Sequence, residues 1–147
     1  MILISHRGNF DGYHPEFENN PIQIDRALKN GFDVEIDVWY KDNEWYLGHD
    51  EPQYKVNLEY LKNDKFWCHA KNIEALNEML TQNIHCFWHQ EDDVTLTSKG
   101  YIWTYPGKDL TENSIVVMPE KYLEKWWRYK FKKCLGICSD FVVNYKK

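Results

Sequence analysis

The chain has 147 residues and a formal net charge of −5, from 18 basic and 23 acidic side chains. This length predicts a single domain, residues 1–147, because two domains would each lie near the lower limit for an independent hydrophobic core. A hydrophobic content of 43% with 7 Gly and 5 Pro predicts a packed globular fold and excludes a disordered or collagen-like chain. Since only residues 121–133 gather Lys and Arg, we expect no long nucleic acid as a partner.

The apolar segments bear on compartment and redox state. Residues 1–7 contain too short an apolar run for a signal peptide, and nowhere do about 18 apolar residues follow one another as a membrane span requires. We therefore expect a cytoplasmic protein without a transmembrane segment. Four cysteines lie within or beside apolar runs without the paired spacing of a zinc site, and we expect them to be buried, reduced thiols: Cys68, Cys86, Cys134 and Cys138.

Hydrophobic periodicity predicts strands that alternate with helices. In the first fifty residues we expect a strand at 2–5, a helix at 21–30 after the Asn20 cap, an alternating strand at 32–39 and a return strand at 45–47. Further strands are expected at 66–70, 84–88, 101–104, 115–118 and 135–138, with helices at 73–80 and at about 120–132.

This alternation predicts an α/β fold with a parallel sheet, and seven such strands favour closure into a barrel. A typical eight-fold α/β barrel needs about 250 residues. The connection at 89–100 is also too short for a full helix. We therefore predict a trimmed TIM-type (β/α) barrel with shortened or missing outer helices, and an open α/β sheet is the alternative.

Polar side chains gather at the predicted strand ends, where α/β folds place their active sites: His6, Arg7, Glu35, Asp37, His49, Asp50, His69 and Lys71. Glu35 and Asp37 are two residues apart on one strand, so they share a face and offer hard oxygen ligands of the kind that suit Mg²⁺ or Ca²⁺. His69 and Lys71 have the same spacing. The set therefore indicates a divalent metal ion and an anionic substrate.

Four segments resemble, in order and spacing, the glycerophosphodiester phosphodiesterase family within the wider phospholipase-C-like phosphodiesterases: His6-Arg7-Gly8, Glu18-Asn19, Glu35-Ile36-Asp37-Val38 and Gly48-His49-Asp50. The similarity covers roughly residues 1–50, is weaker at 68–72, and returns at 135–140. The resemblance implies a barrel fold and metal-dependent hydrolysis of a phosphodiester. It does not identify the substrate, and the open site expected of so short a chain suits a small glycerophosphodiester or a glycan- or lipid-linked phosphodiester.

The resemblance also implies a role for each matched residue. His6 and His49 correspond to the acid and base pair, Arg7 to a phosphate contact, and Glu35 and Asp37 to metal ligands, while Glu18 orients the first loop beside the substrate. This set fits the chemistry, because cleavage of a phosphodiester needs a base, an acid and positive charge on the non-bridging oxygens. Trp88 and His89, which end the strand at 84–88, are further candidates for substrate binding.

The chain departs from the family pattern at the third strand. Where the family has a Glu followed two residues later by a Lys, this chain has His69 and Lys71. His69 is therefore a candidate metal ligand, and an imidazole favours Mn²⁺ or Zn²⁺ over Ca²⁺. We expect a divalent metal ion, Mg²⁺ or Ca²⁺ first, with Mn²⁺ as the variant that His69 introduces.

Three other functions stay open at this point. The first is a module that binds a phosphorylated ligand without turnover, and the second is a phospholipase-D-like lyase that forms a cyclic phosphate. The third is a protein that contacts carbohydrate through its 7 tryptophans. A homodimer is also possible, because a trimmed barrel leaves strand edges or faces uncovered.

Overall fold

The computed structural model of the protein describes residues 1–122 and 133–146. Its first elements are β1 (Ile2–His6), η1 (Pro15–Phe17), α1 (Pro21–Lys29), β2 (Asp33–Lys41), β3 (Glu44–Leu47), β4 (Tyr54–Val56), α2 (Leu58–Leu61), β5 (Phe66–Ala70) and α3 (Ile73–Thr81). These are followed by β6 (Cys86–Phe87), β7 (Val94–Leu96), β8 (Ile102–Thr104), β9 (Ser114–Val117), η2 (Pro119–Lys121), β10 (Gly136–Ser139) and η3 (Val142–Tyr145).

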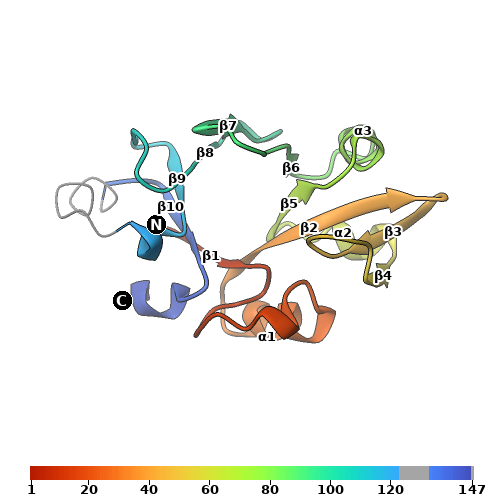
Figure 1. Ribbon diagram of the computed structural model, residues 1–147, viewed down its shortest axis with the longest axis horizontal. Helices are drawn as coiled ribbons and strands as arrows, with labels where there is room; N and C mark the ends of the chain where they lie inside the picture. Colours follow the sequence, from red (N-terminus) through yellow and green to blue (C-terminus); the bar gives the residue numbers. More distant parts are fainter. Residues whose placement is uncertain (123–132, 147) are drawn as a thin grey trace.

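All strands of the described residues belong to one sheet. Seven of them run parallel, in the spatial order β6-β5-β2-β1-β10-β9-β8. The antiparallel strands lie beside this set: β3 and β4 continue from the far end of β2, and β7 pairs with β8. The result is a mixed α/β fold with a curled, half-barrel sheet and few helices (Figure 1).

The chain between β6 and β8 brings the two ends of the curled sheet together. The backbone N–H of Ser98 donates to the carbonyl of Cys86 at 2.8 Å, and Thr95 Oγ1 donates to the carbonyl of Trp88 at 2.8 Å. This segment was expected as a connection too short for a helix, and the structure shows that it contains the short strand β7.

The helices begin where the sequence provides caps. The Asn20 side chain accepts from the Ile22 N–H with Pro21 at the first position of α1, and the Asn72 side chain accepts from the Ala75 N–H at the start of α3. The predicted helix at about 120–132 lies mostly outside the described residues. Its first two residues belong to η2. No helix of the described residues is long and apolar enough to cross a bilayer.

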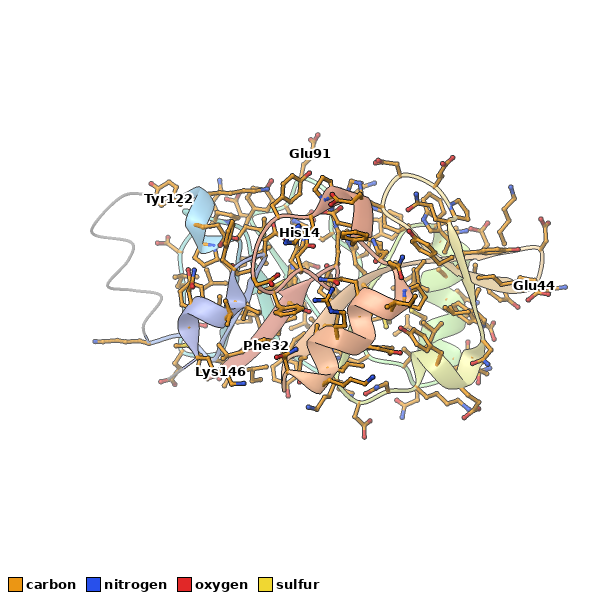
Figure 2. The ribbon with its side chains drawn as sticks, turned by 90° about the horizontal axis from the view of Figure 1, so that it is seen from below. His14, Phe32, Glu44, Glu91, Tyr122 and Lys146 are labelled. Carbon is orange, nitrogen blue, oxygen red and sulfur yellow. The ribbon has the colours of Figure 1, made fainter. Side chains whose placement is uncertain are left out.

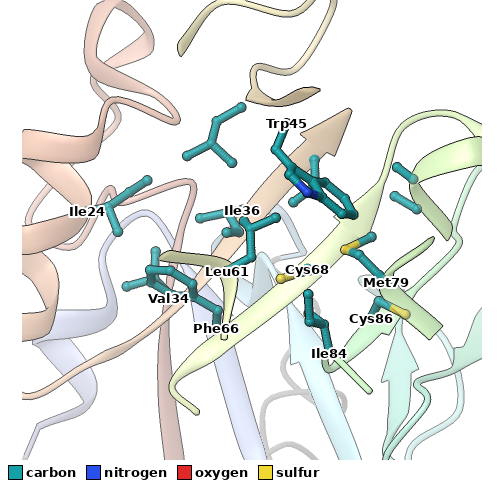
Figure 3. Packing of buried hydrophobic residues seen from close by; sticks show 14 of the residues in the cluster. Ile24, Val34, Ile36, Trp45, Leu61, Phe66, Cys68, Met79, Ile84 and Cys86 are labelled. Atoms are coloured by element: carbon teal, nitrogen blue, oxygen red, sulfur yellow. The ribbon is translucent and has the colours of Figure 1, made fainter. Parts of the chain in front are cut away.

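The two faces of the sheet carry different side chains. Val34, Ile36 and Val38 of β2 pack with residues of α1, α2 and α3 in an outer core between the sheet and the helices (Figure 3). Since side chains alternate along a strand, Glu35 and Asp37 face the opposite, inner side.

A second cluster packs in the inner region. It consists of Ile4, Trp67, Phe87, Trp103, Ile115, Val117, Met118 and Cys138. Along the long axis of the molecule, Tyr122 lies near one end. Glu44, at the tip of the β2–β3 hairpin, lies at the other end (Figure 2). The four cysteines are buried and form no disulfide.

Candidate active site

The register of three parallel strands brings the sequence motifs together. His6 at the end of β1 is paired with Glu35 on β2, and Asp37 on β2 is paired with His69 on β5. Because the strands are parallel, these side chains meet at the carboxyl end of the sheet. Glu35 and Asp37 are almost fully buried there.

Asp140, one residue beyond β10, orients His6. The Nδ1–H of His6 donates to Asp140 Oδ1 at 2.8 Å, and Asn9 Nδ2 donates to the same oxygen at 3.1 Å. Because Nδ1 is bound to the Asp140 carboxylate, the other ring nitrogen, Nε2, faces Glu35. The distance from Nε2 to Glu35 Oε2 is 4.0 Å. Burial alone would lower the pKa of His6, but the hydrogen bond to Asp140 and the charge of Glu35 outweigh it, so this pKa is raised.

Arg7 connects the first loop to the buried carboxylates. Its Nη1 donates to Glu18 Oε2 at 2.9 Å, and its Nε lies 3.0 Å from Asp37 Oδ2. The backbone N–H of Arg7 donates to the Glu35 carbonyl at 2.9 Å, and Arg7 has a left-handed φ of +54°. Burial alone would lower the pKa of Arg7, but the three carboxylates raise it, so the guanidinium stays charged.

The Asn19 side chain holds Asp37 at both its side chain and its backbone. Asn19 Nδ2 donates to Asp37 Oδ2 at 2.9 Å, and the Asp37 N–H donates to Asn19 Oδ1 at 2.8 Å. Burial would raise the pKa of Asp37, but the imidazole of His69 and the charges of Arg7 and Lys71 lower it well below its usual range. Asp37 therefore stays a carboxylate although it is fully buried.

His69 has a fixed ring orientation. Its Nε2–H donates to the His89 carbonyl at 2.9 Å, and its ring stacks on Phe87 with centroids 5.2 Å apart and planes 6° apart. Because a carbonyl oxygen can only accept, Nε2 carries a proton. Nδ1 then faces the two carboxylates, at 3.1 Å from Asp37 Oδ1 and 3.8 Å from Glu35 Oε1.

The Glu35, Asp37 and His69 side chains could hold a divalent metal ion. Each offers one ligand atom, and these atoms lie within 4.8 Å of one another. Asp37 Oδ1 is buried and makes no hydrogen bond, so it has an unused lone pair directed at this space. Burial and the neighbouring Asp37 raise the pKa of Glu35, which is the effect that a bound cation would relieve. The donor set of two carboxylates and one imidazole fits a divalent ion.

The strand ends open into a pocket of about 560 Å³. Among the residues expected in the site, its lining includes His6, Arg7, Glu18, Glu35, His69 and His89. Burial lowers the pKa of His89, and the nearby His69 adds to this effect. The opposite wall contains aromatic and apolar side chains from β8, β9 and the segments that follow them.

Asp37, which is fully buried behind the lining, lies outside it, and so do the expected site residues Lys71, His49 and Trp88. Lys71 Nζ is 3.7 Å from Asp37 Oδ1, at the back of the carboxylates. The His49 ring pairs with Asp50 at 2.7 Å and is 40% exposed, although the preceding Gly48 N–H donates to the Asp37 carbonyl at 3.2 Å. Trp88 packs against the outer core, because it alternates with Phe87 and His89 along the chain.

The structure gives a role to four residues to which the sequence analysis assigned none. Asn9, Asn19 and Asp140 hold side chains of the candidate site in place, and Glu120 accepts from the Asp140 N–H at 3.2 Å. The strand-end rule applies equally to Asp140, which follows the apolar run at 135–138. No sequence signal marks Glu120, because its place depends on how β9 lies beside β10.

Comparison of the chain with protein-family models, with curated proteins and with solved structures found no match. The support for a function comes from the arrangement of side chains described above and from the motif resemblance.

Proposed function

We propose that the protein is a metal-dependent phosphodiester hydrolase, similar to glycerophosphodiester phosphodiesterases, on a trimmed TIM-type barrel. One observation carries the proposal: His6, held by Asp140, directs Nε2 toward the Glu35–Asp37–His69 ligand set, of which Glu35 and His69 line the pocket and Asp37 is buried behind them. A proton carrier, a metal-ligand set and the Arg7 guanidinium thus border the same space. This is the combination that hydrolysis of a phosphodiester requires.

Each residue of the site has its own role in the proposed reaction. His6 Nε2 takes a proton from the attacking water as its oxygen bonds to phosphorus, the P–O ester bond breaks, and the leaving alkoxide is protonated. A divalent ion bound by Glu35, Asp37 and His69 supplies positive charge to the non-bridging oxygens. Arg7 adds a second positive charge at the pocket wall. Asp140 keeps the His6 ring in the tautomer that leaves Nε2 free for proton transfer.

His49, the second residue of the proposed acid and base pair, lies farther from the site than His6 does. Its ring is bound to Asp50 and does not line the pocket. The loop that carries it is nevertheless attached to the Asp37 backbone through Gly48. We therefore assign the first proton transfer to His6, and a role for His49 in protonating the leaving group requires rotation of its side chain toward the pocket.

The barrel in this proposal rests on the contacts at the ends of the sheet. Seven parallel strands follow one another, and the segment after β6 is hydrogen-bonded to both β6 and β8. Such contacts are expected where a short barrel closes without its outer helices. A cytoplasmic location and a homodimer stay predictions.

The reaction is tested by ³¹P NMR of glycerophosphodiesters and bis-p-nitrophenyl phosphate in the presence of Mg²⁺, Mn²⁺, Ca²⁺ or EDTA. The proposal predicts a phosphomonoester product that requires a divalent ion and is lost in His6→Ala. A cyclic phosphate product identifies a lyase instead. Binding of a phosphorylated ligand without any product identifies a binding module.

A further inference from the structure

The pocket has a second arm beyond the metal-ligand set. We call it the aromatic arm, defined by Tyr13, Trp103, Tyr105, Met118 and Phe141, all of which line the pocket. Trp103 is buried, whereas Tyr13 is 59% exposed, Tyr105 48% and Phe141 37%. Large aromatic side chains are thus partly exposed to solvent around the mouth. Rings in this position provide apolar surface for a ligand.

Glu120, in the same pocket lining as the aromatic arm, offers one fixed and unused acceptor. Glu120 Oε1 accepts from Ser139 Oγ at 2.9 Å and from the Asp140 N–H at 3.2 Å, and these bonds hold the carboxylate in place. Glu120 Oε2 is buried and makes no hydrogen bond, and Glu120 lines the pocket. A buried acceptor without a donor is costly, so a ligand that brings an O–H group gains by supplying one.

The orientation of the rings narrows the ligand class. The rings of Tyr105 and His89, which also lines the pocket, have centroids 5.5 Å apart and are tilted by 42°. They do not form the parallel-walled slot that would sandwich a flat base. A saturated ring with C–H groups on its faces and hydroxyls at its edge satisfies both the aromatic side chains and Glu120.

We propose that the aromatic arm binds a cyclic sugar, so that one alcohol of the phosphodiester is a sugar whose hydroxyl donates to Glu120 Oε2. This inference rests on the proposed phosphodiesterase function, since the metal-ligand set holds the phosphate. Apart from Tyr13, which lies between β1 and η1, the aromatic arm comes from β8 and the ends of β8, β9 and β10, in the same pocket as His6, Glu35 and His69 of β1, β2 and β5. A phosphate held beside the metal-ligand set therefore directs one ester group into the aromatic arm.

The test uses two p-nitrophenyl phosphodiesters of equal ring size. In one, the second alcohol is the 6-hydroxyl of methyl glucoside, and in the other it is cyclohexylmethanol, which has no ring hydroxyls. Water bonds to phosphorus, the aryl P–O bond breaks, and p-nitrophenolate and one proton are released. We expect kcat/KM for the sugar diester to be higher by roughly 10- to 100-fold, the usual effect of one hydrogen bond to a charged group.

Glu120→Gln is the matched substitution. The glutamine oxygen keeps the two donors from Ser139 and Asp140, so its NH₂ group takes the place of the free acceptor. We expect this variant to remove the preference for the sugar. Glu112→Gln, at an exposed residue outside the pocket lining, is expected to keep it. Thermal unfolding checks both variants, and Tyr105→Ala, which is also expected to weaken the preference, replaces Glu120→Gln if that variant does not fold.

The outcomes separate this inference from the proposed function. Equal kcat/KM for the two diesters, unchanged in Glu120→Gln, overturns the sugar site while the hydrolase stands. If neither diester is cleaved, the hydrolase proposal fails, and calorimetric titration with methyl glucoside 6-phosphate and cyclohexylmethyl phosphate decides the remaining question. Tighter binding of the sugar phosphate, lost in Glu120→Gln, supports the sugar site, and equal binding overturns it.

Discussion

Asn19→Ala tests the claim that one buried amide holds the metal-ligand set together. Asn19 is fully buried and joins Asp37 through two hydrogen bonds, at 2.9 and 2.8 Å. Alanine removes both partners but leaves Asp37 in place. The substitution therefore exposes the cost of holding this carboxylate without its support.

The expected loss of stability follows from these contacts. A hydrogen bond to a charged group contributes about 1.5 to 3 kcal/mol, and a buried N–H without an acceptor costs about 1 to 3 kcal/mol. Asn19 also has a left-handed φ of +59°, where alanine costs about 1 kcal/mol more than asparagine. The two lost bonds alone predict a decrease of about 2.5 to 6 kcal/mol in the free energy of unfolding.

Urea unfolding measures this decrease, and Asn83→Ala provides the matched control. Asn83 has nearly the same φ, +57°, but it is exposed, and its side chain makes no hydrogen bond within the described residues. Its substitution isolates the backbone cost. If Asn19→Ala is no more destabilising than Asn83→Ala, the two bonds to Asp37 do not support the site, and the reasoning is refuted.

Three further predictions concern histidines. His69→Glu adds a hard anionic ligand, so we expect calorimetry to show a higher ratio of Mg²⁺ to Mn²⁺ affinity than in the wild type; an unchanged ratio means that His69 is not a ligand. His6→Ala is expected to lower kcat by about 10²- to 10⁴-fold, and His49→Ala much less, so equal losses would contradict the assignment of the first transfer to His6. Burial lowers the pKa of His85 to about 4 from 6.5, so the unfolded chain binds more protons between these values and stability decreases as the pH falls from 6.5 to 4. In urea unfolding, His85→Gln should lose this pH-dependent contribution, which is up to about 3 kcal/mol. Identical pH profiles of stability for the wild type and His85→Gln would contradict the prediction.

The strand ends were predictable because they follow from local patterns. Alternation along 32–39 placed Glu35 and Asp37 on one face, and the structure confirms that both lie on the inner side of β2. The same rule separates His89 from Trp88, because neighbouring residues of a strand face opposite ways. Trp88 packs in the outer core for this reason.

The contacts of the supporting residues could not be predicted, because their partners are distant in the chain. Asp140 reaches His6 across 134 residues, and only the pairing of β1 with β10 brings them together. His49 has the expected motif, yet its side chain binds the neighbouring Asp50, a choice that local sequence does not determine. The periodicity also gave no strand at β7, whose apolar side chains Val94 and Leu96 are exposed and form no buried face.

The most direct test of the account follows Mn²⁺ binding and hydrolysis of bis-p-nitrophenyl phosphate in the same titration, for the wild type and Asp37→Asn. The account predicts one bound Mn²⁺ ion, p-nitrophenolate release that rises with occupancy of that site, and loss of both in the variant. Full occupancy without cleavage, or cleavage that persists in EDTA, would contradict a metal-dependent phosphodiesterase built on Glu35, Asp37 and His69.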